Sequence, residues 1–137
     1  MKRILVAEDR PASLELIRTV LESAGYEVIE ALDGEEAIEK AFGTPVDLVL
    51  LDLQMPKVNG FGVLAELRED PRYSRTPIVA LTASAMQGDR ERALAAGFSA
   101  YVTKPVELTV LRSEIDRLIG GEQLPDPSTA KPLGAVS

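Results

Sequence analysis

The sequence contains neither cysteine nor histidine. Without cysteine the chain can form no disulfide and no thiolate metal site. Without histidine it lacks the commonest general base and the zinc ligand sets that are built on imidazole. Any metal ion bound by this chain would therefore be a hard cation held by oxygen ligands.

Long apolar runs and an excess of basic residues are also missing. No apolar stretch approaches the roughly 20 residues of a membrane span, and the N-terminus lacks the charged-then-apolar pattern of a signal peptide. We therefore expect a cytoplasmic protein that makes no membrane contact. The formal net charge of −7 argues against direct binding to nucleic acid, although such a charge also serves general solubility.

The 137 residues, a length suited to one domain, alternate regularly between short β-rich runs and longer helical patterns. The predicted strands are 1–7, 26–30, 46–52, 76–81 and 100–102. The predicted helices are 11–24, 33–42, 61–68, 86–96 and 106–119. No β-hairpin signal interrupts this alternation, so each strand is followed by a helix.

Five such strand–helix units predict an α/β fold, in which helices cover both faces of a doubly wound parallel sheet. The continuous apolar run at 46–52 is typical of a central strand, whereas the alternating run at 26–30 indicates a strand near the edge. From Gly120 the sequence becomes rich in proline, glycine and small residues. We therefore predict one domain over 1–120 and a disordered tail or linker over 121–137.

Polar residues follow the predicted strands at the edge where ligands bind in open parallel sheets. Glu8 and Asp9 follow the first strand, and Asp52 ends the third. Thr82 follows the fourth strand and Lys104 follows the fifth. In the strand order 2-1-3-4-5 these four strands are neighbours, so all five residues would share one rim of the sheet.

Three clustered carboxylates repel one another, and a divalent cation removes that conflict. Oxygen ligands with room for water favour Mg²⁺. Three acids, a dication and Lys104 sum to zero charge, so the cluster could accept a phosphoryl group on a carboxylate. A lone Asp52 would usually mark only the end of its strand. Asp47 lies at the opposite end of the same strand and is no part of this cluster.

Five short motifs in this order resemble the receiver domain of two-component response regulators. They are AED (7–9), LLDLQMP (50–56), NG (59–60), ALTA (80–83) and YVTKP (101–105). The resemblance covers about residues 2 to 119 and implies the flavodoxin-like (βα)₅ fold with strand order 2-1-3-4-5. It also implies a signalling switch rather than an enzyme, one that catalyses its own phosphorylation and its slow dephosphorylation.

The resemblance implies a role for each residue of the cluster. Asp52 would take a phosphoryl group from the phosphohistidine of a sensor histidine kinase or a histidine phosphotransfer protein. Mg²⁺ would be bound directly by Asp9, through water by Glu8, and also by Asp52 and the backbone carbonyl of Gln54. Lys104 would pair first with Asp52 and then with the phosphoryl group.

Other residues would transmit the signal. The resemblance implies that the Thr82 hydroxyl moves to the phosphoryl group, helped by the Ala83 amide, and that Tyr101 then turns inward. Residues 86–119 would form the output surface for a downstream protein. The side chains of Gln54 and Ser84 would tune the phosphoryl lifetime, and the bond between Lys104 and proline 105 would be cis.

Several alternatives remain open at this stage. Phosphatases of the haloacid-dehalogenase type also use an aspartyl nucleophile, but they need a second acid two residues later, where this chain has Gln54. A degenerate receiver would bind partners without phosphorylation, although such proteins usually lack one of the acids or the lysine. The sequence GFGVLA at 60–65 formally matches a dinucleotide fingerprint but does not follow a first strand. We expect a single-domain regulator, and a piece of a longer protein is the alternative.

Overall fold

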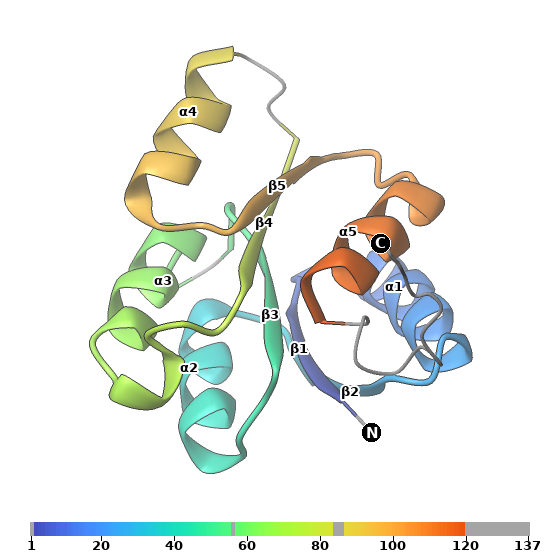
Figure 1. Cartoon of the computed structure of the whole chain (residues 1–137), viewed down its shortest axis with the longest axis horizontal. Coiled ribbons are helices and arrows are strands. Elements are labelled where there is room, and N and C mark those ends of the chain that lie inside the picture. The colour runs from blue at the N-terminus through green and yellow to red at the C-terminus, as the bar shows by residue number, and fades with distance from the viewer. Residues whose placement is uncertain (1, 56, 84–86, 120–137) are drawn as a thin grey trace, which may run out of the picture.

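The computed structural model describes residues 2–55, 57–83 and 87–119. A sheet of five strands forms the centre of this part of the chain, as can be followed in Figure 1. The strands are β1 (Arg3–Ala7), β2 (Glu27–Ala31), β3 (Leu48–Asp52), β4 (Ile78–Thr82) and β5 (Ala100–Thr103). They are parallel and follow the order β2-β1-β3-β4-β5, which confirms the predicted fold class and strand order.

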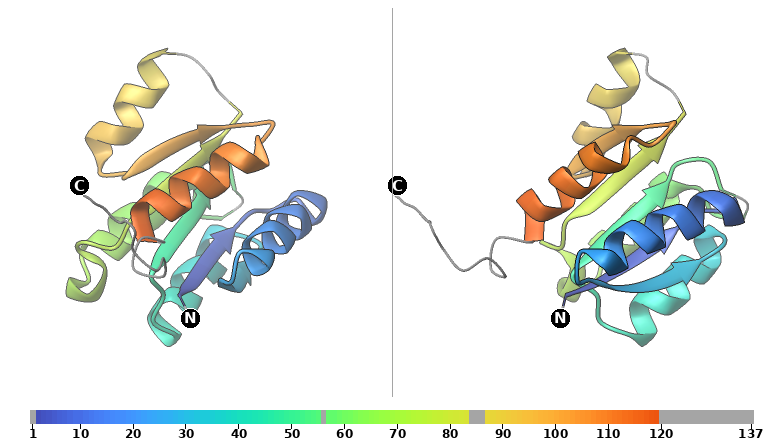
Figure 2. Two further views of the ribbon diagram at one scale, coloured as in Figure 1. Left: turned by 45° about the vertical axis from the view of Figure 1, so that its right-hand side comes forward. Right: turned by 90° about the vertical axis from the view of Figure 1, so that its right-hand side faces the viewer.

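The helices cover both faces of this sheet. They are α1 (Pro11–Ser23), α2 (Gly34–Gly43), α3 (Gly60–Arg68), α4 (Gln87–Ala96) and α5 (Leu108–Ile119). Figure 2 shows α1 and α5 together on one face, with α2 and α3 on the other. A short 3₁₀ helix, η1 (Pro71–Tyr73), follows α3 and was not predicted. It begins at a proline and ends at the buried Tyr73, whose hydroxyl donates a hydrogen bond to the Ala41 carbonyl.

The central strand β3 is buried along its whole length. Because side chains alternate across a strand, Leu48 and Leu50 pack in the core beneath α1 and α5. Val49 and Leu51 pack in the opposite core, beneath α2, α3 and α4. This two-sided burial explains the continuous apolar run and fixes the register of β3 between β1 and β4.

Local signals in the sequence set the helix ends. Pro11 occupies the first turn of α1, and Gly25 follows that helix with φ +97° in the left-handed region. The Asp33 carboxylate caps α2 by accepting a hydrogen bond from the Glu36 amide at 2.8 Å. Asn59 caps α3 by accepting one from the Gly62 amide at 3.0 Å.

Several predicted boundaries need correction by one or two residues. The third strand begins at Leu48 rather than at 46, because the Asp47 carboxylate accepts a hydrogen bond from the Arg3 amide at 2.8 Å at that end of the sheet. The fourth strand is Ile78–Thr82 and not 76–81, and the last helix begins at Leu108 rather than at 106. The predicted tail at 121–137 and residue 86 lie outside the described residues. Within the described part, no helix is long and apolar enough to cross a membrane.

Candidate active site

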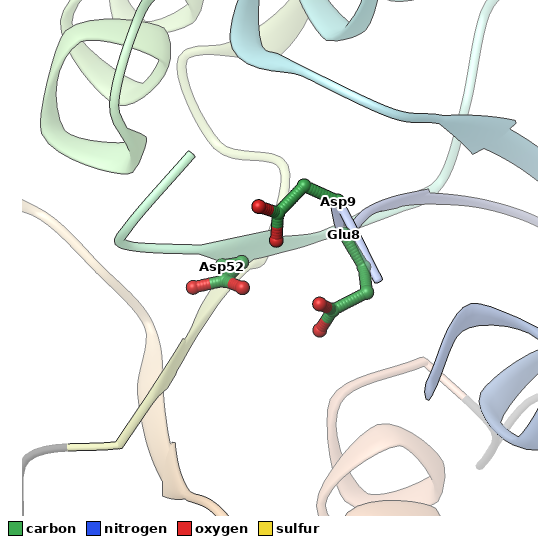
Figure 3. A group of neighbouring side chains, drawn as sticks. All are labelled: Glu8, Asp9 and Asp52. Atoms are coloured by element: carbon green, nitrogen blue, oxygen red, sulfur yellow. The ribbon is translucent and has the colours of Figure 1, made fainter. Parts of the chain in front are cut away.

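The carboxyl ends of β1, β3, β4 and β5 meet at one edge of the sheet. Glu8 and Asp9 follow β1, and Asp52 is the last residue of β3. Figure 3 shows these three carboxylates gathered at the strand ends. One oxygen of each lies within 4.8 Å of an oxygen of the other two. The structure therefore brings together the three acids that the sequence predicted to share this rim.

The lysine predicted at this rim lies between two of the acids. Lys104 Nζ is 2.7 Å from Glu8 Oε1 and 2.8 Å from Asp52 Oδ2. Glu8 has no exposed surface and Asp52 retains only 4% exposure, whereas Asp9 is exposed. The two buried acids thus share one ammonium group, and the third acid faces solvent.

This arrangement shifts the pKa of both Glu8 and Lys104. Burial is the largest cause that raises the pKa of Glu8 above its ordinary value, and the nearby Asp52 charge acts in the same direction. The hydrogen bonds from Lys104 and from the Arg10 amide oppose this rise without cancelling it. For Lys104, burial acts to lower the pKa, but the contacts with Asp52 and Glu8 outweigh it and the pKa is raised. Lys104 therefore remains a cation at neutral pH.

Backbone amides hold the acid side chains in place. The Gln54 amide donates a hydrogen bond to Asp52 Oδ1 at 2.9 Å, and the Arg10 amide donates one to Glu8 Oε2 at 3.1 Å. The Glu8 amide itself donates to the Ala31 carbonyl at 3.0 Å, which ties the end of β1 to β2. The orientation of each buried carboxylate is thus fixed by the chain segment that follows it.

A cleft of about 460 Å³ opens beside the acids. Its lining consists of Asp9, Arg10, Asp52, Gln54, Ala83, Lys104 and Pro105. The sequence predicted five of these residues for the site but missed Arg10 and Pro105. Both could have been predicted from their positions, since Arg10 directly follows Asp9 and Pro105 directly follows Lys104. A residue next to a site residue at the end of a strand also lies at the rim of the sheet.

The remaining predicted residues lie on β4 and β5. Thr82 is the last residue of β4 and is buried, and the amide of Lys104 donates a hydrogen bond to its carbonyl at 2.7 Å. Tyr101 lies on β5, is half-buried and packs against the core beneath α2 and α3. The peptide bond from Lys104 to Pro105 is cis. Ser84 lies outside the described residues.

The donor set suits one class of metal ion. The acidic cluster offers only carboxylate oxygens, and the Gln54 backbone lines the same cleft. Hard cations such as Mg²⁺ prefer oxygen ligands and keep several waters, for which the exposed side at Asp9 leaves room. A cation here would also relieve the repulsion between the three acids.

A sequence model of the response regulator receiver domain matches residues 4–116. The chain belongs to this family. Among curated relatives, the polar-differentiation response regulator DivK of Brucella anthropi is 35% identical over 119 residues, which cover 87% of this chain and 97% of that protein. The chain is therefore a receiver domain of two-component signalling, a class of domain that acts as a signalling switch, and it is not a phosphatase of the haloacid-dehalogenase type.

Solved structures agree with this assignment. The chemotaxis protein CheY4 of Vibrio cholerae superposes with a TM-score of 0.82 at 29% identity, over 87% of this chain and 99% of that one. The receiver domain of a sensor histidine kinase from Pseudomonas aeruginosa PAO1 is 38% identical, with a TM-score of 0.80 over 87% of this chain and 98% of its own. In that protein a magnesium ion is coordinated in the active-site cleft.

Proposed function

We propose that this receiver domain takes up a phosphoryl group on Asp52 in a reaction that depends on Mg²⁺. The donor would be the phosphohistidine of a sensor histidine kinase or a histidine phosphotransfer protein. The observation that carries this proposal is the pairing of a buried, oriented Asp52 carboxylate with the Lys104 ammonium at 2.8 Å, within reach of two further acids. A purely structural ion pair would not need the additional carboxylates of Glu8 and Asp9.

The metal would be held by Asp9, Asp52 and the Gln54 backbone carbonyl, with Glu8 acting through water. When bound, Mg²⁺ supplies positive charge that neutralises the acids and the incoming phosphoryl oxygens. The chain itself contributes the orientation of Asp52, because Oδ1 accepts from the Gln54 amide and Oδ2 contacts Lys104. Preorganised charge of this kind is the main source of catalysis in phosphoryl transfer.

In the transfer step, a carboxylate oxygen of Asp52 forms a bond to phosphorus as the bond from phosphorus to the donor imidazole nitrogen breaks. The electron pair of that bond stays on the imidazole nitrogen, which then takes up a proton. An ionised carboxylate has no proton to lose, so no general base is required, and the absence of histidine from the chain is consistent with this. Lys104 would then contact the phosphoryl oxygens.

The phosphorylated state would be read by residues on β4 and β5. The Thr82 hydroxyl and the Ala83 amide would bind the phosphoryl group, and Tyr101 would turn inward. The surface over 86–119, described here from 87 onward, would then dock a downstream protein. Slow loss of the phosphoryl group would reset the switch. A cytoplasmic location and the absence of direct nucleic-acid binding stay predictions from the sequence.

The test supplies Mg²⁺ and a small phosphodonor and follows the mass of the intact chain. We expect an increase of one phosphoryl group that survives acid and is lost in base, as an acyl phosphate would be. Asp52→Asn should abolish it. Asp47→Asn is the matched control, because Asp47 lies at the opposite end of β3 and contacts the Arg3 amide instead.

Three results would contradict this proposal or its metal dependence. If the mass increase persisted in Asp52→Asn, another residue would be the acceptor. If the wild-type protein showed no increase with either a small donor or a phosphohistidine protein, the chain would be a receiver that binds partners without phosphorylation. Omission of Mg²⁺ should also suppress the reaction, and an unchanged rate would remove the metal from the proposal.

A further inference from the structure

The loop between β3 and α3 lies directly against the first turn of α2. An ideal Cβ built on Gly34 would lie 1.8 Å from the Val58 carbonyl oxygen and 2.6 Å from its carbonyl carbon, distances at which real Cβ atoms are essentially never found. Gly34 is part of α2 and its φ lies outside the left-handed region. Close approach of the loop backbone, and not backbone conformation, is therefore what requires glycine at this position.

Two glycines of α3 hold the other side of the same loop. The Gly60 amide donates a hydrogen bond to the Leu53 carbonyl at 3.2 Å, which closes the base of the loop. A Cβ on Gly60 would lie 2.9 Å from the Asp52 carbonyl oxygen. A Cβ on Gly62 would lie 2.6 Å from a Val58 methyl group, Cγ1. Within the described part of the loop, Val58 thus lies between the first turns of α2 and α3 and contacts both.

Lys57 also connects this loop to α2 through two ion pairs. Its backbone has φ +70°, and its ammonium lies 3.7 Å from Asp33 Oδ2 and 3.6 Å from Glu35 Oε1. Asp33 is also the N-cap of α2, so the helix terminus and the loop share one carboxylate. These exposed pairs are weak individually, and the backbone contact at Gly34 is the stronger constraint.

The loop also carries the part of the cleft that lies nearest the phosphoacceptor. Gln54 lines the cleft, and its amide orients Asp52 Oδ1 at 2.9 Å. Metal ligands must be held to within about 0.5 Å of the productive geometry. Mutation of a group that holds a metal ligand in place typically lowers the metal affinity about 10–100-fold. A shift of this loop would displace both the Gln54 carbonyl and the Asp52 carboxylate.

We propose that Gly34 and Gly62 are positioning residues for the Mg²⁺ site, with the first turn of α2 and the start of α3 supporting the loop that carries Gln54. The inference rests on the proposed function, because it assigns these glycines a task in metal binding and phosphoryl uptake. It adds α2, a helix that contributes no residue to the cleft lining, to the machinery of the site.

The first test compares two glycines of the same helix. Gly34→Ala should force the loop away from α2, whereas Gly43→Ala meets nothing within 4 Å and serves as the matched control. Titration of Mg²⁺ by calorimetry should show about tenfold weaker binding for Gly34→Ala and wild-type binding for Gly43→Ala. The phosphorylation rate should require more Mg²⁺ to reach half-maximum but should approach the wild-type value at saturation, a split that general destabilisation would not produce.

A second test compares Gly34 with Gly62, because Gly34 approaches the backbone of Val58 and Gly62 approaches its side chain. Gly62→Ala should weaken Mg²⁺ binding through the Val58 side chain, so Val58→Ala in the same chain should restore it. Gly34→Ala clashes with the Val58 backbone, so the same Val58→Ala change should not rescue it. This pair also serves if Gly34→Ala does not fold, because Gly62→Ala and its rescue then test loop positioning alone.

Wild-type Mg²⁺ affinity in both folded glycine variants would overturn the inference. So would a Gly62→Ala affinity that Val58→Ala fails to restore. Failure of the proposed function gives a different result, since the wild-type protein would then take up no phosphoryl group at any Mg²⁺ concentration. Mg²⁺ titration of the variants separates the two cases, because it does not depend on phosphorylation.

Discussion

Within β3, Leu51 and Asp52 are neighbours with similar burial and opposite chemistry. Leu51 is fully buried among apolar side chains and Asp52 retains 4% exposure. Packing stabilises the first, whereas the second depends on the Lys104 ammonium and the Gln54 amide. β1 repeats the pattern, since the apolar Ala7 is followed by the fully buried Glu8. We therefore expect the middle of the sheet to contribute most to stability, and the buried acids at its carboxyl end to lower it.

The largest effect should come from the apolar side of this comparison. Leu51→Ala should lower the free energy of unfolding by about 2–5 kcal/mol, because the substitution leaves a cavity in a closely packed core. Urea unfolding followed by circular dichroism measures the loss. Leu16→Ala is the control, since Leu16 is 59% exposed and its truncation should change stability by less than about 0.5 kcal/mol. Equal losses in the two variants would contradict this account of the core.

The next largest effect should come from the shared cation. Lys104→Met leaves Glu8 and Asp52 buried without an ammonium, which should cost about 2–4 kcal/mol in the presence of EDTA at neutral pH. Because the Lys104 side chain keeps 14% exposure, water can partly solvate the two acids, so we expect this cost to lie near the lower end of that range. Added Mg²⁺ should recover part of the loss. The half-exposed Lys40 pairs with Glu36 at 3.3 Å, so Lys40→Met should cost much less.

Removal of the buried acid Glu8 should raise the stability of the protein, whereas removal of Lys104 should lower it. Burial raises the pKa of Glu8, so the folded protein disfavours its ionised form more than the unfolded chain does. Without metal, Glu8→Gln should therefore raise stability by about 0.5–2 kcal/mol at pH values above the folded-state pKa of Glu8. The gain should disappear as the pH falls and Glu8 takes up a proton. Melting temperatures measured in EDTA across this pH range test both statements, and a gain that grew towards low pH would contradict them.

The smallest stability effect should belong to the exposed acid. Asp9→Asn should change the free energy of unfolding by less than about 0.5 kcal/mol in EDTA, because Asp9 faces solvent. Mg²⁺ should stabilise the wild-type protein according to its affinity and should stabilise the variant far less. Parallel unfolding curves with and without Mg²⁺ provide the measurement. Equal stabilisation of both proteins by Mg²⁺ would contradict the proposed role of Asp9 as a metal ligand.

The fold and the acidic cluster could be predicted from the sequence for one reason. In a parallel sheet every strand ends at the same edge, so the residues after each apolar run must lie near one another once the strand order is known. The resemblance to receiver domains implied the order of the strands, and the gathering of Glu8, Asp9 and Asp52 then follows from this rule. The contacts of Lys104 with two of the acids are an example of the same rule on β5.

What the sequence could not predict depends on contacts between distant segments. The η1 helix has a local cap, since the Asp70 carboxylate accepts a hydrogen bond from the Arg72 amide. Its buried Tyr73 hydroxyl, however, donates to the Ala41 carbonyl, a partner 32 residues away. The Arg68 guanidinium donates to the carbonyls of Tyr73, Thr76 and Gly97, and no local pattern signals those partners. The approach of Gly34 to Val58 is invisible for the same reason, because glycine before a helix pattern is ordinary. Periodicity describes each element alone, whereas these features arise where elements meet.

The position of β3 between two hydrogen-bonded neighbours has a consequence for amide exchange. Its residues pair with β1 on one side and β4 on the other, and all of them are buried. Amides in such a strand exchange with solvent only when the whole domain opens. The side chain of Asp52, the proposed phosphoacceptor, is therefore expected to be carried by one of the slowest-exchanging parts of the molecule. We therefore expect the charge of a phosphoryl group on Asp52 to move the surrounding loops and side chains and to leave β3 in place.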